Sequence, residues 1–509
     1  MTTAPSSPPD PFTTTIDELD RIGRAAAAAF DQWSTLPPRT RARALVAAAD
    51  ALIASADELI AVAIGETGLT DVRLRGELKR TAVQLRLFAD VVVDGDYLDV
   101  RIDDADAQFA LGPRPDLRRT LTPLGPVLNF SGSNFPFAFS FAGGDTASAL
   151  AAGCSVIVKA HSGHPELSLR TARIVSDALE GAGAPPNTLQ VIFGQEQGVE
   201  MLKSVHVRAG SFTGSVHAGR LLADVAAARP APIPFYGELG SVNPQFVTRA
   251  KLESDPVVVG EGFVASVASS AGQFCTKPGF LFVSDESVIA AAIRHAAERV
   301  DEHRMLNPRI AQSYRARRDT VLTTEGVEVI APGAIRFDVD GQGWVTPTIV
   351  STGAAVLESS GPRLLDESFG PLAVVVRYDH ESQLADLARR LFPGNLTGGV
   401  HALNDESSSE LVALIDQLQR SSGRVLFNGW PTGVAVTPAM QHGGPWPATT
   451  NDAGTSVGTA AIGRFLRGVS YQNVPEHLLP MALRRDNPWG VPQRIAPAGA
   501  SISWGERSA

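Results

Sequence analysis

Apolar residues recur three and four positions apart through residues 16–95, with charged residues between them. The stretches TIDELDRIGRAAAAAFDQW and RARALVAAADALIASADELIAVAIGETG carry this pattern, which predicts that each is a helix. Residues 97–120 instead alternate between apolar and polar positions and contain turn-forming Asp, Gly and Pro. The chain is therefore expected to begin with helices and then to make a short excursion of β-structure.

From residue 121 short apolar runs alternate with longer amphipathic ones. The apolar runs predict buried strands, namely GPVLNF, SVIVKA, LQVIFG, AGSFTGS and APIPFYGELG. Among them lie FAFSFAGGDTASALAAG (137–153) and ELSLRTARIVSDALEGAG (166–183), which predict helices. A second alternating block starts near residue 250 and continues to about residue 430. This alternation is typical of βαβ units, so the sequence predicts an α/β fold with parallel sheets.

The composition favours a soluble globular protein over a nucleic-acid-binding or membrane-spanning one. The chain has 509 residues, of which 44% are hydrophobic and 19% charged, as in soluble globular proteins of more than one domain. Its net charge of −10 argues against nucleic acid as a partner. The most apolar stretch is interrupted by Pro136, Gly143, Gly144 and Asp145, so no membrane-spanning segment is expected.

Cysteine usage indicates the compartment and one candidate for chemistry. Two cysteines cannot form a disulfide framework, and the N-terminus has neither a basic nor an apolar signal region, so a cytoplasmic location is expected. Cys154 precedes a buried strand and is expected to be a core residue. Cys275, in GQFCTKPG, lies between a helix-like run and the strand-like FLFVS, where a thiol can be reactive.

Four short segments have complementary chemistry: SGSNFPFAF, VIVKAHSGHP, FYGELGSVNP and GQFCTKPG. Each has an ordinary explanation when taken alone. Cys275 could be structural, Glu238 a capping or solvated carboxylate, and Asn134 a turn residue before Pro136. Together they offer a thiol nucleophile, a carboxylate base and an amide donor, which is a set that acyl chemistry requires.

The order of these segments resembles that of the NAD(P)-dependent aldehyde dehydrogenases, over essentially the whole chain. GQFC is similar to the family's segment around its catalytic cysteine, ELGSVNP to the one around its catalytic glutamate, and NFP to the one around its catalytic asparagine. The resemblance implies an aldehyde dehydrogenase-like α/β fold with two doubly wound domains and a small β oligomerisation element. It implies Cys275, Glu238 and Asn134 as catalytic residues, and no metal.

The resemblance also implies a reaction. The Cys275 thiolate would attack the aldehyde, and the Asn134 side-chain amide and the Cys275 N–H would stabilise the oxyanion of the hemithioacetal. Hydride loss to the nicotinamide would give a thioester, and Glu238 would activate water to hydrolyse it. Relatives that transfer the acyl group to coenzyme A typically lack this glutamate, so a free acid is the expected product.

Six residues are implied as the cofactor site. The turn FTGSVHAG places Gly214 and Ser215 at the start of a helix, where phosphate is favoured, although glycine in such a turn is a weak signal. By resemblance Lys159 contacts the adenosine ribose. The resemblance of DESFGP to the family's Glu-x-Phe-Gly-Pro segment implies that Glu367 would hold the nicotinamide ribose and that Phe369 would flank the ring.

The sixth cofactor residue, Ser162, bears on the choice between NADP and NAD. Many NAD-preferring relatives have a glutamate at this position, and its carboxylate would repel the additional phosphate of NADP. The Ser162 hydroxyl can instead donate a hydrogen bond to that phosphate, and Lys159 and the nearby His161 and His164 can add positive charge. NADP is therefore the expected cofactor, with NAD as an alternative.

The resemblance implies a division of the chain into three parts. Residues 1–96 and 122–248 would form the NAD(P)-binding domain, and residues 249–452 the catalytic domain. Residues 97–121 and 453–509 would form a bridging element, which has little core of its own and would pack on a second subunit. A homodimer or homotetramer is expected.

The resemblance implies a small-molecule aldehyde as the substrate. GETGL, RLRGELKRTAVQLRLFA and residues 440–480 resemble the 2-oxoglutarate semialdehyde (2,5-dioxopentanoate) dehydrogenases of bacterial pentose and sugar-acid degradation. A carboxylate on that substrate requires donors or a cation. Arg464, Arg467, Lys277 and the turn Ser456–Gly458 are candidates, and the sequence selects none of them.

Three other functions stay open. A related NADP-dependent aliphatic aldehyde dehydrogenase shares part of the pattern. A non-catalytic relative is disfavoured because all three catalytic residue types are present. A cysteine hydrolase would need a histidine base, and no histidine segment is evidently placed for that role.

Overall fold

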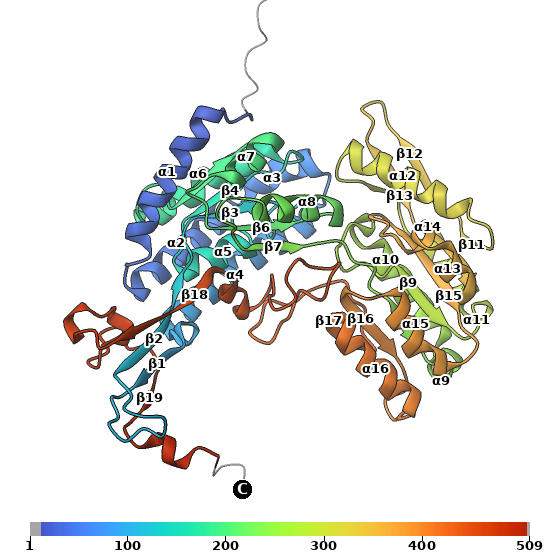
Figure 1. Ribbon diagram of the computed structural model, residues 1–509. Helices are drawn as coiled ribbons and strands as arrows, with labels where there is room; N and C mark the ends of the chain where they lie inside the picture. The colour runs from blue at the N-terminus through green and yellow to red at the C-terminus, as the bar shows by residue number, and fades with distance from the viewer. Residues whose placement is uncertain (1–11, 506–509) are drawn as a thin grey trace, which may run out of the picture.

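The computed structural model of the chain describes residues 12–505. Two α/β lobes lie side by side, and a thin β-element projects from the first of them (Figure 1). The N-terminal stretch that lacks signal-peptide features lies largely outside the described residues. Among residues 12–505, none of the helices combines the length and the apolar character that crossing a membrane requires.

Helices form the start of the chain, as predicted: α1 (Ile16–Trp33), α2 (Pro38–Ala54), α3 (Ala56–Thr67) and α4 (Asp71–Asp94). The second predicted helix is in fact two helices, because α2 ends at Ser55 and α3 starts directly after it. Helix α3 ends at Gly68, whose φ of +69° is a left-handed conformation that glycine adopts without strain.

A five-stranded parallel sheet forms the centre of the first lobe. In spatial order its strands are β5 (Leu189–Ile192), β4 (Val156–Lys159), β3 (Val127–Phe130), β6 (Ala209–Thr213) and β7 (Phe235–Glu238). The helices between these strands are α5 (Gly144–Ala152), α6 (Pro165–Gly181), α7 (Gln195–Lys203) and α8 (Val216–Ala227).

The helix predicted over residues 137–153 was too long, because only Gly144–Ala152 is helical. The N–H groups of Phe137 and Ala138 donate to the Glu77 carboxylate on α4, at 2.8 and 3.0 Å. These two contacts fix the preceding segment as a loop that packs on α4. The same loop carries Asn134.

The second lobe contains a seven-stranded sheet, in which all neighbouring strands are parallel except β11 and β14. Its order is β11 (Glu328–Ala331), β14 (Thr348–Gly353), β15 (Leu372–Arg377), β9 (Phe280–Val283), β8 (Gln245–Val247), β16 (Asn395–His401) and β17 (Ser422–Phe427). A small antiparallel sheet of β10 (His303–Arg304), β13 (Gly343–Thr346) and β12 (Ala334–Phe337) flanks it.

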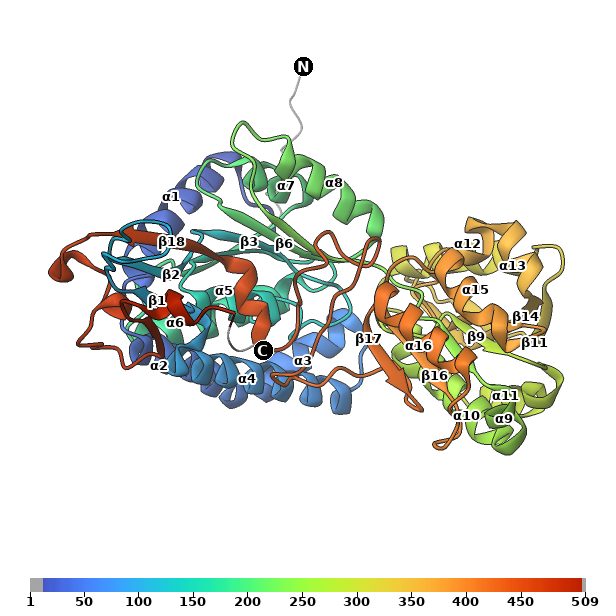
Figure 2. The same cartoon turned by 60° about the horizontal axis from the view of Figure 1, so that its bottom comes forward.

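Helices cover both faces of the second sheet (Figure 2). They are α9 (Arg249–Ser254), α10 (Pro256–Ala268), α11 (Ser287–Glu298), α12 (Pro308–Leu322), α13 (Ala354–Ser360), α14 (Pro362–Leu365), α15 (Leu384–Leu391) and α16 (Ser409–Ser421). Two separate apolar cores form on this sheet, which indicates helices on opposite faces. The prediction of two doubly wound α/β units is confirmed by these sheets.

The projecting β-element joins residues far apart in the sequence. Its sheet has the order β18 (Leu466–Gln472), β2 (Leu117–Pro123), β1 (Val100–Asp103) and β19 (Gln493–Ala496). A small apolar cluster, which includes Val100, Ile102 and Leu483, packs beneath it. The C-terminal segment thus supplies both the edge strands and half of this small core.

Candidate functional site

The carboxyl edge of the first sheet carries several of the expected site residues. Lys159 and Glu238 are the last residues of β4 and β7, and Gly214 and Ser215 directly follow β6. Because the strands are parallel, these residues share one edge. The strand order reverses around β3, and open α/β sheets bind ligands at such a reversal.

Cys275 lies in a turn of the second lobe, between the short helix η2 (Ser269–Gly272) and β9. The Asn243 side chain holds this turn, since its Nδ2 donates to the carbonyl oxygens of Cys275 at 2.8 Å and Lys277 at 3.0 Å. The Oδ1 of the same buried amide accepts from two hydroxyls at 2.9 Å. Asn243 therefore fixes the backbone from which the thiol projects.

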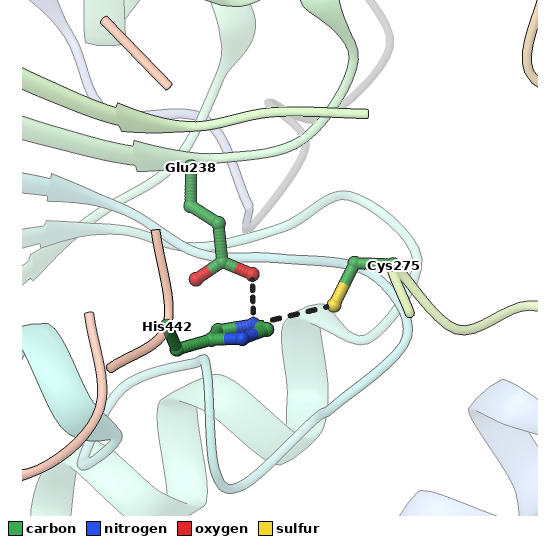
Figure 3. A group of neighbouring side chains, drawn as sticks. All are labelled: Glu238, Cys275 and His442. Carbon is green, nitrogen blue, oxygen red and sulfur yellow. Dashed lines mark hydrogen bonds and ion pairs between the residues drawn. The ribbon is translucent and has the colours of Figure 1, made fainter. Parts of the chain in front are cut away.

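Glu238, His442 and Cys275 converge on one point from three separate segments (Figure 3). The Nε2 atom of His442 is 2.8 Å from Oε1 of Glu238 and 3.6 Å from Sγ of Cys275. His442 and Glu238 are almost fully buried, whereas Cys275 is partly exposed. The Oγ of Ser456 donates to the second carboxylate oxygen of Glu238. One imidazole nitrogen thus faces both a carboxylate and a thiol.

The burial and charge around Cys275 disfavour its thiolate form, so the thiol needs a base to ionise at neutral pH. Burial, followed by the negative charge of Glu238, raises the pKa of Cys275 well above its ordinary value. Burial opposes ionisation of Glu238, but the charge and hydrogen bond of His442 outweigh it and lower the pKa of the carboxyl group. Cys154 is fully buried in the core of the first lobe, and burial raises its pKa to about 11.

The expectation that no histidine is placed beside the cysteine was wrong. His442 follows Gln441 in QHGGPWP, a glycine- and proline-rich segment that crosses from the second lobe back to the first. The distance between residues 275 and 442 in the chain hides the contact. The available signal was a histidine within the C-terminal segment that departs from the common pattern of the family.

Asn134 lies against the turn that carries the thiol. Its Nδ2 donates to the carbonyl oxygen of Gln273 at 2.9 Å, and its own carbonyl oxygen accepts from Nη2 of Arg73 at 2.5 Å. The structure therefore brings Asn134, Glu238 and Cys275 together. One amide proton of Asn134 is engaged, and its other proton can serve an oxyanion.

The residues expected at the adenosine end of the cofactor lie around β4 and α8. Gly198 leaves room for the Lys159 side chain, because a Cβ there would be 2.9 Å from its Cγ. Burial lowers the pKa of Lys159. Ser162 is exposed on the following turn, and Ser215 caps α8 by accepting from the N–H of Ala218 at 3.3 Å.

The residues expected at the nicotinamide end reach across from the second lobe. The Glu367 carboxylate approaches Gly240, where a Cβ would be 2.2 Å from its Oε2. Burial raises the pKa of Glu367, and the positive charge of Lys277 opposes that rise. Phe369 packs against the apolar core of the first lobe.

These features fit a dinucleotide. Lys159 has no carboxylate within ion-pairing distance among the described residues, so it can bind a ribose or phosphate. Gly214 and Ser215 expose backbone at the start of α8. Because Gly240 has no side chain, the Glu367 carboxylate can lie against its backbone, at the position expected for the nicotinamide ribose.

Most of the cations considered for the substrate carboxylate are engaged elsewhere. Arg464 forms a buried ion pair with Asp145 at 2.5 Å, and Lys277 donates to the carbonyl oxygen of Leu372 at 2.7 Å. Arg467 is exposed on β18. In the Ser456–Gly458 turn, the Ser456 hydroxyl already donates a hydrogen bond to the Glu238 carboxylate.

Comparison with known proteins agrees with this geometry. The profile of the aldehyde dehydrogenase family matches residues 13–452. The alpha-ketoglutaric semialdehyde dehydrogenase of Acinetobacter baylyi is 41% identical over 94% of this chain and 91% of its own length. Alpha-ketoglutaric semialdehyde dehydrogenase 2 of Azospirillum brasilense is also 41% identical, over 94% of this chain and 90% of its own.

Solved structures show the same fold. Aldehyde dehydrogenase C of Pseudomonas syringae, solved with NAD+ and octanal, has a TM-score of 0.75 at 21% identity, over 90% of both chains. Proline utilization A of Bradyrhizobium japonicum has a TM-score of 0.75 at 25% identity, and the match covers 90% of this chain but 45% of that one. From the family profile, the relatives and the geometry together, the chain belongs to the aldehyde dehydrogenase family and is an oxidoreductase.

Proposed function

We propose that the protein oxidises 2-oxoglutarate semialdehyde (2,5-dioxopentanoate) to 2-oxoglutarate, with NADP preferred over NAD, in sugar-acid or pentose degradation. The observation that supports an aldehyde dehydrogenase reaction is the convergence of Cys275, His442 and Glu238 on one point. The residues that suit a dinucleotide lie beside it. The names and 41% identities of the two bacterial relatives support the choice of aldehyde.

The first step is attack by sulfur on the aldehyde carbon. Neutral His442 with its proton on Nδ1 accepts the thiol proton of Cys275 at Nε2, and the imidazolium that forms donates this Nε2–H to the Glu238 carboxylate 2.8 Å away. The S–C bond forms while the aldehyde oxygen gains negative charge. The free amide proton of Asn134 and the Cys275 N–H would stabilise this oxyanion, and one such donor is typically worth about 3 kcal/mol.

NAD(P), which Lys159, Ser215 and Glu367 would hold, would supply the hydride acceptor that the conversion of the adduct into a thioester requires. Glu238, in contact with His442, then removes a proton from water, and the hydroxyl adds to the thioester carbon. The C–S bond breaks, the acid leaves, and the thiolate is regenerated. Ser456 keeps the Glu238 carboxylate oriented throughout.

Absorbance at 340 nm tests this proposal, using 2,5-dioxopentanoate with NADP or NAD and comparing the wild type with Cys275→Ala. We expect reduction that depends on Cys275 and is faster with NADP. Turnover of hexanal without turnover of the dioxo acid would retain the mechanism and reject the substrate. Undiminished activity in Cys275→Ala would reject the mechanism.

The preference for NADP rests on positive charge near the end of β4. Burial, followed by nearby charges that include those of Lys159 and Arg309, lowers the pKa of His161 to about 3, so His161 is neutral at pH 7 and does not add the positive charge expected of it. The carboxylate of Glu66 is committed to the N–H groups of Glu166 and its neighbour at the start of α6. Exposed Ser162 adds a hydroxyl donor but no charge, so Ser162→Glu should shift the kcat/KM ratio strongly towards NAD, whereas Ser162→Ala, which loses only that donor, should shift it much less.

A broad aliphatic aldehyde dehydrogenase is the second candidate. The observation in its favour is the stack of Phe135 on Phe274, with ring centroids 5.2 Å apart, because these residues directly follow Asn134 and precede Cys275. An apolar chain can pack on such rings. Comparing hexanal with 2,5-dioxopentanoate decides between the two candidates.

We also propose a homodimer or homotetramer in the cytoplasm, assembled through the projecting β-element. Exposed apolar residues gather near its end, with Ile495 45%, Ile502 77% and Trp504 68% exposed. Burying them against a second copy would be favourable. Light scattering after gel filtration measures the mass, and a monomer would reject this assembly.

A further inference from the structure

A cavity of about 470 Å³ lies next to the candidate thiol. Phe135 and Phe274 contribute to its wall, and these residues adjoin Asn134 and Cys275 in the chain. Helix α4 contributes Arg73, Glu77 and Arg80 to the opposite wall. A space of this size beside the reacting sulfur suits the remainder of an aldehyde substrate.

The two arginines of this wall differ in their contacts. Arg73 donates to the carbonyl oxygen of Asn134 at 2.5 Å and to the Ser270 hydroxyl, and lies 3.7 Å from the Glu77 carboxylate. Its guanidinium carbon is also 4.9 Å from the ring centroids of both Phe135 and Phe274. Arg73 therefore ties α4 to the walls of the cavity.

Arg80 has no comparable partner. Its Nη1 is buried but finds no hydrogen-bond acceptor within the described part of the chain. Its guanidinium carbon lies 5.4 Å from the ring centroid of Phe139, a cation–π contact that gives the buried Nη1 group no hydrogen-bond acceptor. A buried, unpaired donor of a charged group is costly, so an anionic ligand at this position would be favourable.

The balance of charge in the cavity points the same way. Arg73 and Arg80 share the single carboxylate of Glu77, whose Oε1 already accepts two backbone N–H bonds. Arg80 is also near enough to Cys275 and Glu238 to interact with both charges. The unpaired cation thus lies within a short molecule's reach of the reacting sulfur.

We propose that Arg80 is the subsite that binds the carboxylate of an aldehyde acid, which fixes the distance between the anionic end and the carbon attacked by Cys275. This inference rests on the proposed function for the identity of the full substrate. A guanidinium suits the role because its parallel N–H groups match the two oxygens of a carboxylate. An uncharged aldehyde would leave Arg80 unpaired and would gain nothing from it.

A matched pair of substrates tests the role of Arg80. Succinate semialdehyde and butanal have the same number of carbons and differ in the terminal carboxylate. In Arg80→Met we expect kcat/KM for succinate semialdehyde and 2,5-dioxopentanoate to fall 10- to 100-fold, the usual effect of losing a charged hydrogen bond. The value for butanal should change less than threefold, and Arg80→Lys should recover part of the loss.

Two controls separate a binding role from other roles. Arg75→Met removes an exposed arginine of the same helix, which pairs with Asp57 and Asp71, and should leave both substrates unaffected. The rate of Cys275 alkylation by iodoacetamide should fall by much less than the turnover of succinate semialdehyde in Arg80→Met, because burial and the neighbouring carboxylates affect the pKa of the thiol more than the charge of Arg80 does. An equal loss on both aldehydes, or alkylation that slows as much as the turnover of succinate semialdehyde, would show that Arg80 acts on the thiol or the fold and would overturn the inference.

Binding of the product gives a readout that does not depend on turnover. Calorimetry with 2-oxoglutarate should show binding to the wild type and weakening of 10-fold or more in Arg80→Met. If the wild type fails to oxidise 2,5-dioxopentanoate but Arg80→Met still loses succinate semialdehyde selectively, the proposed function fails and the subsite stands. The subsite is rejected if Arg80→Met and the wild type have equal kcat/KM values for succinate semialdehyde and 2,5-dioxopentanoate and bind 2-oxoglutarate with equal affinity.

Discussion

Replacing His442 tests the central claim about the thiol. His442→Gln keeps a side chain that can donate to Glu238 but cannot accept the proton of Cys275. The matched control is His401→Gln, which alters another buried histidine, one that packs on Trp430 with ring centroids 4.3 Å apart. Both variants lose a buried imidazole, and only one loses it beside the sulfur.

The magnitude follows from the environment of the sulfur. Burial and the negative charge of Glu238 raise the pKa of Cys275 well above its ordinary value, so without a base little thiolate forms at neutral pH. A positive charge within about 4 to 6 Å of a thiol lowers its pKa by roughly 1 to 3 units. The imidazolium of His442 would form 3.6 Å from the sulfur. Its loss should therefore reduce the thiolate population at pH 7 by about 10- to 1000-fold.

The assay is the rate of inactivation by iodoacetamide between pH 6 and pH 10, supported by kcat/KM for the aldehyde. In His442→Gln both rates should be low at neutral pH and rise tenfold per pH unit towards the raised pKa of the unassisted thiol. The wild type should be reactive at neutral pH, because its thiol proton is transferred to the imidazole. A His442→Gln profile that overlays the wild type within twofold would refute the reasoning.

Three other results are expected. Glu238→Gln should give a rapid burst of reduced cofactor, followed by turnover at least tenfold slower than in the wild type, because the acyl group stays on Cys275. Stopped-flow absorbance measures both phases, and a steady state without a burst would contradict this expectation. Arg464→Ala should lower the free energy of unfolding in urea by about 3–5 kcal/mol, because it leaves the buried Asp145 carboxylate without its ion-pair partner. A decrease below about 1 kcal/mol would contradict this expectation. Asn243→Ala should lower kcat more than it lowers the midpoint of unfolding, since it frees the turn around Cys275.

Much of the site could be predicted from short motifs, because local sequence sets the type and position of each group. Cys275 between a helix and a strand, Glu238 at the end of a strand, and Lys159 at the end of another lie where the apolar pattern placed them. The helix expected over residues 137–153 shows the limit of such reasoning. The carboxylate of Glu77, distant in the chain, captures two of its N–H groups and keeps its first part a loop.

The sequence by itself determined the class of fold and the residue types that carry the chemistry, because periodicity of apolar residues reflects local backbone geometry. Only the tertiary structure decided which base serves the thiol and which arginine is unpaired. His442 reaches Cys275 across 167 residues of chain, and Arg80 is distinguished from Arg73 only by what its N–H groups fail to contact. Hydrogen-bond partners and charge compensation depend on distances between segments, which no local pattern encodes.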